Sequence, residues 1–256
     1  MKPYFDLCIP TKKSEPEQRI LFGMVNNERE LHDLYKLRYQ VYSDKKYINP
    51  KLYPNQEESD SYDSSKKTIN FSAVTNGKTI ACIRLIIDDP LPTEKAFTFS
   101  EPEALKLIPR HKRGELGRFI IIPPDRTNKK YLPRGLVMLF MLATVSTYAK
   151  EHGIEGGYSF VKKSLDVKLK KMRVPIRSIS SFEQHYPDDG VLARYFNQPT
   201  DPVIPMYFLT EECVNFVQKT LNKKILFQKI ESTTYRLHPV SYALYRTFLR
   251  VRRWFS

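Results

Sequence analysis

The chain has 256 residues, of which 41% are hydrophobic, and this length suits one large domain with a sizeable core. Its net charge of +14 indicates an acidic partner, which could be nucleic acid, an anionic membrane or an acidic protein. The three cysteines are far apart in the sequence, which argues against a cysteine-built zinc site and fits a reducing, cytoplasmic compartment. Since there is no run of about 18 apolar residues and no apolar N-terminal segment, we expect neither a membrane-spanning helix nor a secretory signal.

The N-terminal part of the chain divides into an arm and a first strand. Residues 1–19 are polar and contain proline, which predicts a flexible N-terminal arm. The apolar run over 20–25 is a candidate strand, and Asn26 or Asn27 can cap the helix that follows.

Residues 28–45 have the apolar spacing of an amphipathic helix, which places Arg38 on the buried face. There Arg38 is either part of a functional site or an arginine that snorkels at the edge of the core. We favour a site, because an acidic loop follows over 46–68. That loop contains Asp60 and Asp63, three residues apart, although acids in a loop are more often simply solvated.

Two strands joined by a tight turn come next. Residues 69–75 alternate apolar and polar side chains, and Asn76-Gly77 predicts a type I′ hairpin turn. The return strand over 78–87 is apolar on both faces, so it should be central in a sheet. Arg84 lies in its middle, where it must pair with a carboxylate or bind a ligand, because an unpaired buried charge is costly.

A further strand begins at Glu115 and carries Gly117, Arg118 and Phe119. In a regular strand Glu115 and Arg118 would face opposite sides of the sheet. Gly117 between them predicts a β-bulge, which would bring the two charged side chains to one face. The alternative is an edge strand whose charged start faces water.

The remaining elements complete an α/β domain. Residues 133–151 form a helix that is apolar nearly all round and should be buried under the sheet. Strands are expected at 154–161, 174–182 and 203–209, with helices at 164–173 and 211–222. The order of these elements predicts a mixed, mainly antiparallel twisted sheet flanked by helices, in one domain over 20–222.

The extension over 223–256 ends in a basic and aromatic stretch from 235 onward that has no acidic residue. It could lie in an anionic membrane interface, on the inner face of the membrane, or form a basic helix docked on the domain.

These motifs together resemble a known family. A helix with Leu34-Tyr35-Lys36-Leu37-Arg38 precedes Glu58-x-Asp60-x-Tyr62-Asp63, then Ile83-Arg84-Leu85, then Glu115-x-x-Arg118-Phe119. This order resembles the acyl-homoserine-lactone autoinducer synthases, and more closely their relatives, the N-acyl amino acid synthases and exosortase-associated acyltransferases. The resemblance implies a GNAT-type acyltransferase fold with a bulged central strand. It also implies amide formation between a fatty acyl thioester and the amine of an amino acid or a related small amine.

The resemblance also suggests roles for the charged residues. Glu115 would be the catalytic base, and the backbone near Arg118 and Phe119 would hold the thioester carbonyl. Asp60 and Asp63 would bind the ammonium group of the acceptor. The arginines would complete the site: Arg38 and Arg84 would pair with these acids or hold the acceptor carboxylate, and Arg118 would lock the acids in place.

The same resemblance bears on donor and partners. GNAT enzymes that use coenzyme A carry a glycine-rich pyrophosphate loop, whereas residues 126–130 here contain no glycine. We therefore expect an acyl-phosphopantetheine thioester on an acidic acyl carrier protein as co-substrate, with no tightly bound cofactor and no metal. The alternatives are a lactone-signal synthase that uses S-adenosylmethionine, and a non-catalytic basic module that binds membranes or nucleic acid. Nucleic acid is disfavoured as a partner, because the sequence shows no nucleic-acid-binding motif.

Overall fold

The computed structural model describes residues 1–11, 16–122 and 134–243. The strands are β1 Lys2–Ile9, β2 Gln18–Met24, β3 Thr68–Thr75, β4 Lys78–Ile86, β5 Phe97–Phe99, β6 Arg113–Ile121, β7 Gly156–Lys162, β8 Ile176–Ser178, β9 Phe182–Gln184, β10 Val203–Leu209, β11 Phe227–Lys229 and β12 Thr234–Leu237. The helices are α1 Glu28–Asp44, α2 Pro92–Ala96, α3 Glu103–Lys106, α4 Arg134–Glu151, α5 Lys163–Lys171, α6 Ala193–Phe196 and α7 Thr210–Leu221, with 3-10 turns at Pro50–Leu52 and Arg110–Lys112.

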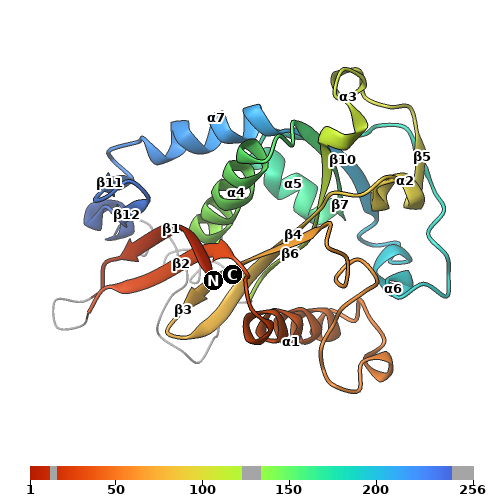
Figure 1. Cartoon of the computed structure of the whole chain (residues 1–256), viewed down its shortest axis with the longest axis horizontal. Coiled ribbons are helices and arrows are strands. Elements are labelled where there is room, and N and C mark those ends of the chain that lie inside the picture. The colour runs from red at the N-terminus through yellow and green to blue at the C-terminus, as the bar shows by residue number, and fades with distance from the viewer. Residues whose placement is uncertain (12–15, 123–133, 244–256) are drawn as a thin grey trace.

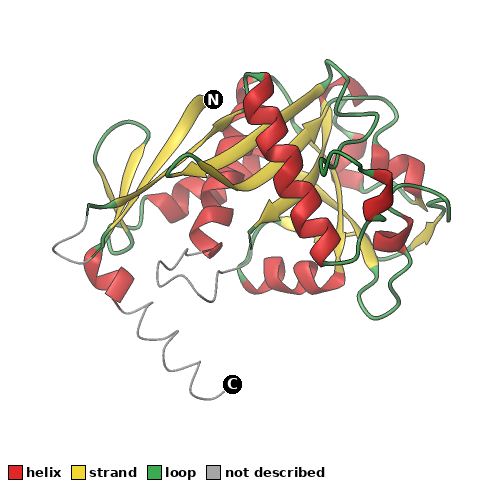
Figure 2. Ribbon diagram, turned by 90° about the horizontal axis from the view of Figure 1, so that it is seen from below, coloured by secondary structure: helices red, strands yellow, loops and turns green. Residues whose placement is uncertain are grey.

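Within the described residues one large sheet runs in the order β11-β12-β1-β2-β3-β4-β6-β7-β10-β8. Its pairs are antiparallel except for β1 with β12 and β6 with β7, which are parallel. Helices α4, α5 and α7 lie on one side of the sheet and α1 lies on the other (Figure 1). In Figure 2, seen from the side on which α1 lies in Figure 1, a long helix crosses the strands. This is the predicted α/β architecture with a mixed, mainly antiparallel sheet.

Local sequence signals explain several elements. The side chain of Asn27 caps α1 by accepting a hydrogen bond of 2.9 Å from the Glu30 N–H. Asn76 and Gly77 both have positive φ, 50° and 70°, as the predicted type I′ turn requires. Helix α4 is buried along most of its length, and its side chains form the centre of the main core together with β1–β4.

The N-terminal arm predicted over 1–19 needs correcting. Residues Lys2–Ile9 form β1, which pairs with β2 on one side and with β12 on the other. The strand was not predicted from the sequence because Pro3 and Asp6 interrupt its apolar side chains. Leu7 and Ile9 are nevertheless fully buried in the main core.

Two other expectations change at the C-terminal side. The single strand predicted over 174–182 is two short strands, β8 and β9, and β9 pairs with β5 in a small separate sheet. The extension after 222 contributes β11 and β12 to the large sheet, so the basic helix expected from 235 onward does not include Tyr235–Leu237. Residues 244–256 of that expected helix lie outside the described residues. Among those described, no helix is both long and apolar enough to cross a membrane.

Candidate active site

Six charged side chains from four parts of the chain meet on the α1 side of the sheet. Arg38 comes from α1, Arg84 from β4 and Arg118 from β6. Three acids come from the loop between α1 and β3: Glu58, Asp60 and Asp63. We call these six residues the ionic cluster. Its charges balance, with three arginines against three carboxylates, as burial of so many charges requires.

Arg38 is fully buried, and each nitrogen of its guanidinium has an acidic partner. Its two terminal nitrogens donate to the two carboxylate oxygens of Asp63 at 2.9 and 2.8 Å, and its Nε donates to Glu58. Such bidentate pairs are the strong form of an ion pair. Arg38 therefore does not snorkel at the edge of the core.

The other two arginines complete the cluster. Arg84 holds both oxygens of Asp60, at 2.7 and 2.9 Å, and also approaches Asp63 at 3.0 Å. Arg118 donates to Asp60 at 2.7 Å and, through Nε, to Glu58 at 3.1 Å. Arg38 and Arg84 thus both pair with the acids of the loop.

The acidic loop is ordered by these contacts and by its own backbone. The Glu58 N–H donates to the Tyr35 carbonyl of α1 at 3.1 Å, and the Asp60 N–H donates to Asp63 at 2.9 Å. The Tyr62 N–H donates to Asp60 at 3.0 Å, and the ring of Tyr62 lies over the guanidinium of Arg84. A loop that could have been solvated is thus fastened to α1 and to the sheet.

The arginines keep the acids ionised. Burial by itself would raise the pKa of Asp60, but Arg118 and Arg84 hold that pKa well below its usual range. In the same way burial opposes ionisation of Asp63, and Arg38 outweighs it and lowers the pKa. The carboxylate of Asp60 is the more open of the two, since its side chain is 11% exposed and that of Asp63 is 2% exposed.

The predicted β-bulge is present in β6. Arg84 pairs with Gly117 and Cys82 pairs with Ile120, so Arg118 and Phe119 together stand opposite the single residue Ile83. The residue with positive φ in the bulge is Arg118, at 53°, and not Gly117. The charge-assisted hydrogen bonds that Arg118 donates to the acids of the ionic cluster offset the strain of this backbone conformation.

The bulge brings Glu115 and Arg118 to the same face, as predicted. Glu115 pairs with Ile86 and Gly117 pairs with Arg84, so these four residues share the α1 face of the sheet. The extra residue of the bulge turns Arg118 to that same face. Glu115 is not a member of the ionic cluster, however. It is 1% exposed, and its Oε2 accepts a hydrogen bond of 2.6 Å from the Thr93 N–H in α2. Burial raises its pKa to about 8.

Gly117 lies between Glu115 and Arg118 and leaves room beside them. A Cβ added at this position would meet no atom within 4 Å. Beyond this point the sheet also loosens, because the β6–β7 pairing ends at Leu116 with Ser159 although both strands continue. The site therefore combines a buried carboxyl group, open space and unpaired strand backbone within a few residues.

Phe119 points elsewhere. Its side chain is partly buried and packs against the main core, on the α4 side. Only its backbone can take part in a site on the α1 side.

Glu58 is a member of the ionic cluster to which the sequence pattern assigned no role. Its signal was the alternation Glu58-x-Asp60, but a glutamate beside Glu57 in a polar loop does not by itself reveal burial.

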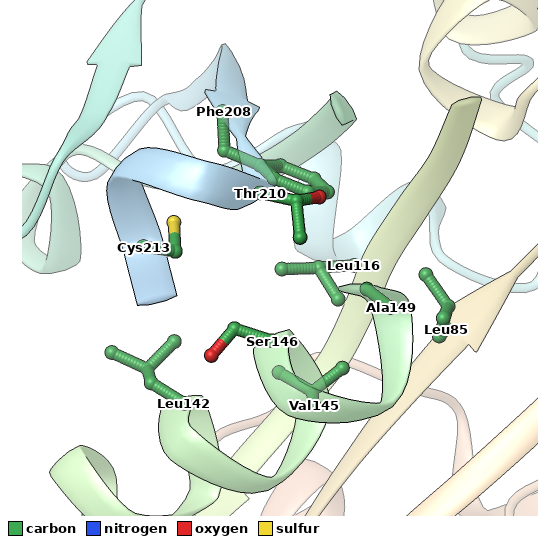
Figure 3. Close-up of a pocket in the computed structure, with 9 residues that line it drawn as sticks. All are labelled: Leu85, Leu116, Leu142, Val145, Ser146, Ala149, Phe208, Thr210 and Cys213. Atoms are coloured by element: carbon green, nitrogen blue, oxygen red, sulfur yellow. The ribbon is translucent and has the colours of Figure 1, made fainter. Parts of the chain in front are cut away.

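A small apolar hollow lies behind β6, on the α4 side. It has a volume of about 10 Å³ and is bounded by Leu85, Leu116, Leu142 and Val145, with Phe208, Thr210 and Cys213 on its far wall. Figure 3 shows these side chains facing one another between α4, β6 and the start of α7. We call it the inner hollow.

Two further expectations from the sequence concern a metal ion and the basic segment 126–130. Within the described ranges no three His, Cys, Asp or Glu side chains are grouped in a way that could hold a metal ion. The basic segment 126–130, on which the expected choice of donor rests, lies outside the described residues.

The family described as N-acyl amino acid synthase FeeM matches residues 33–163, just over half of the chain. The chain belongs to this family. It is an acyltransferase, and the matched segment contains every member of the ionic cluster together with Glu115. No curated protein sequence matches the chain.

Solved structures show the same fold. FeeM, an N-acyl amino acid synthase from uncultured soil microbes, is 16% identical with a TM-score of 0.52, and the match covers 77% of this chain and 93% of FeeM. MesI, a CoA-dependent acyl-homoserine lactone synthase, is 14% identical with a TM-score of 0.52, covering 83% of this chain and 98% of MesI. A second CoA-dependent acyl-homoserine lactone synthase, BjaI with MTA, is 12% identical with a TM-score of 0.54, covering 90% and 99%. The fold of this chain is therefore the GNAT-type fold of these acyltransferases.

Proposed function

We propose that this acyltransferase joins a fatty acyl chain to the amine of an amino acid. The donor is a thioester on the phosphopantetheine arm of an acidic acyl carrier protein. The observation that carries the proposal is the position of Glu115: a buried carboxyl group with a pKa of about 8, two residues along β6 from the open space at Gly117.

The chemistry assigned to Glu115 is proton removal. The amine nitrogen of the acceptor attacks the thioester carbonyl carbon, the C–N bond forms and the C–S bond breaks, and the thiol of the phosphopantetheine leaves. The ionised Glu115 accepts the proton that the amine loses, directly or through one water. A base works best when its pKa is close to the working pH, which a value of about 8 satisfies.

The bulge supports the second requirement, stabilisation of the oxyanion. Where β6 separates from β7, N–H groups near Arg118 and Phe119 are not needed for the ladder between these strands. We place the thioester carbonyl there, because backbone donors fixed in a strained turn do not have to reorganise during the reaction.

The ionic cluster supports acceptor binding. In five of its six residues the side chain is almost fully buried, at 7% exposure or less. The carboxylate of Asp60 is the one that retains some exposure. We therefore assign Asp60 to orient the ammonium group of the acceptor. Asp63, Arg38, Arg84 and Arg118 hold it in position.

The acyl chain is placed along α4, on the other side of β6. The inner hollow there is apolar but holds only about 10 Å³, so side chains around it must move to admit a chain. The proposal of a carrier protein as donor rests on the net charge of +14 and on the absence of glycine from 126–130.

We also propose a cytoplasmic location, where such carrier proteins and their thioesters meet the enzyme, with the residues that follow β12 on an anionic membrane surface. The basic composition of that segment supports the membrane contact. Flotation with anionic vesicles tests it: binding should fall when residues 244–256 are removed, and unchanged binding would contradict it.

The reaction is tested by product mass. The enzyme is incubated with a long-chain acyl carrier protein and a mixture of amino acids, and with the matching acyl coenzyme A in a parallel reaction. The expected product is an N-acyl amino acid formed from the carrier-bound donor. A product that appears only with S-adenosylmethionine would instead indicate a lactone synthase, and no amide from either donor would sink the proposal.

A further inference from the structure

A second, much larger hollow lies on the α4 side of the sheet, away from the ionic cluster. It has a volume of about 650 Å³, within the range of about 300–1,000 Å³ typical of small-molecule sites. Its walls come from the first turns of α4, the end of α5, the second half of α7 and β12. The three helices lie on one side of the sheet in Figure 1, and β12 is a strand near one end of that sheet. We call it the outer groove.

Most of the groove wall is apolar. Leu136 and Leu139 of α4 face Phe216 of α7, and Leu226 and Leu237 line the end near β12. Such a surface would be filled by a hydrocarbon chain, because removing apolar area from water is the main driving force for burial.

The charged residues of the groove are all basic. Arg173 follows α5, Lys219 belongs to α7 and Lys223 follows it, and among the residues that the structure describes no acidic side chain lines the groove. Within the described part of the chain none of these three cations forms an ion pair with an acid. By contrast, other surface lysines do pair, for example Lys150 with Glu211 and Lys170 with Asp166. The groove is thus an apolar channel with an unneutralised basic rim.

We propose that the outer groove binds a single-chain anionic amphiphile, with its hydrocarbon chain against α4 and α7 and its carboxylate at Lys219 and Lys223. No part of this site belongs to the ionic cluster or contacts Glu115. Leu142 lines both the outer groove and the inner hollow, so the two are separated by one side chain. If the proposed function holds, the product of the enzyme is a molecule of this class, and the groove would receive it or respond to it.

The experiment measures binding alone, without acyl donor or acceptor, so its outcome does not depend on the proposed reaction. Decanoate and decan-1-ol are titrated into the full chain in a calorimeter. Decanoate is expected to bind more tightly than the alcohol, and dodecanoate more tightly than decanoate, by up to about fourfold per added methylene.

Two variants locate the head group. Lys219→Gln/Lys223→Gln should weaken decanoate binding by about tenfold or more and leave the alcohol unchanged, because it removes charge-assisted hydrogen bonds. The matched control, Lys168→Gln/Lys171→Gln on α5, removes the same charge from exposed positions outside the groove and should change neither. Equal affinity for decanoate and decan-1-ol would overturn the anionic site and favour a purely apolar channel. An equal loss of decanoate affinity in the control variant would also overturn it and favour non-specific charge attraction.

A third variant locates the chain. Thr220 lines the groove from α7, so the indole of Thr220→Trp should obstruct it and weaken binding of both decanoate and decan-1-ol. Undiminished binding of both probes by this variant would show that they bind elsewhere, and the proposal would fail.

Discussion

Six charges are buried together here, and their balance makes the arrangement tolerable. Each arginine of the ionic cluster contacts two of the three acids, so no charge depends on a single partner. A buried network of this kind contributes little net stability compared with an apolar core, but it is very sensitive to the loss of one member. Its value lies in fixing the loop around Asp60 at one place above the sheet.

Glu58 offers the sharpest test of this balance. Glu58→Gln removes one negative charge between Arg38 and Arg118, which leaves the buried cluster with an uncompensated positive charge. We expect a loss of about 3–5 kcal/mol in the free energy of unfolding, measured by urea denaturation.

The neighbouring residue supplies the control. Glu57 pairs with His32 and Lys36 at the surface, so Glu57→Gln should cost less than about 1 kcal/mol. Similar costs for the two variants would mean that the cluster is not the buried network described.

Glu115 should show its role in the pH dependence of activity. In Glu115→Gln the base is absent, and we expect kcat/KM to fall by about 100-fold or more. The wild-type enzyme should gain kcat/KM as the carboxyl group ionises, with a midpoint near pH 8, and the variant should lack this rise. Full activity with an unchanged pH profile in the variant would remove Glu115 as the base.

The same group predicts how stability depends on pH. The pKa of Glu115 is raised from 4.5 to about 8 in the folded state, so between these values the folded protein holds a proton that the unfolded chain has lost. This contribution to stability is complete below about pH 4.5 and is lost as the pH rises through about 8. Relative to Glu115→Gln, the wild type should lose roughly 1 kcal/mol per pH unit across this window. Parallel stability curves for the two proteins would contradict the buried, protonated carboxyl group.

The bulge in β6 is the element that makes the site. By adding one residue opposite Ile83, it turns Arg118 to the α1 side and leaves Gly117 opposite Arg84 on that same side. The end of β6–β7 pairing just before this point leaves strand backbone unpaired beside the open space. An unbroken ladder would have turned Arg118 away from Glu58 and Asp60.

Gly117→Ala tests whether the open space is used. Gly117 does not have a positive φ, and a Cβ there meets no atom, so the variant should fold with equal or slightly higher stability, by up to about 1 kcal/mol. If the acceptor or the thioester occupies the space, kcat/KM should fall by about tenfold or more.

Gly153→Ala is the matched control. Its Cβ also meets no atom, but its φ is +69°, so this variant should lose about 1 kcal/mol of stability and keep its activity. Unchanged kcat/KM in Gly117→Ala would show that no substrate group lies beside Gly117.

The whole molecule is held together by pairing between distant parts of the chain. β1 lies between β2 and β12, so the N-terminal strand connects the C-terminal strands to the sheet that carries the site. The main core beneath it contains side chains from β1, β4, α4 and β12. The extension after 222 is thus integrated into the sheet as far as β12.

Leu7→Ala tests this integration. Leu7 is fully buried in the main core, so its truncation should cost about 2–5 kcal/mol in the free energy of unfolding. Lys2→Ala, at the exposed start of the same strand, should change stability by less than about 0.5 kcal/mol. A negligible effect of Leu7→Ala in thermal or urea unfolding would restore the picture of a loose N-terminal arm.

Signals that reside within a few consecutive residues were readable from the sequence. The periodic face of α1, the Asn76-Gly77 turn and the buried arginine in β4 each follow from local spacing, and the order of the charged motifs resembled the family to which the chain belongs. The existence of a bulge near Gly117 was predictable in the same way, because a glycine interrupts an otherwise regular apolar strand.

Only the tertiary structure decided which charges meet. The pairing of Arg38 with Asp63, the burial of Glu58 and the separation of Glu115 from the cluster all depend on contacts between residues far apart in the sequence. The same holds for β1, in which Pro3 and Asp6 interrupt the apolar pattern and which gains its burial from β2, β12 and α4. Local spacing determines which way a side chain faces on its own element, whereas the register between strands and the packing of helices determine what it faces.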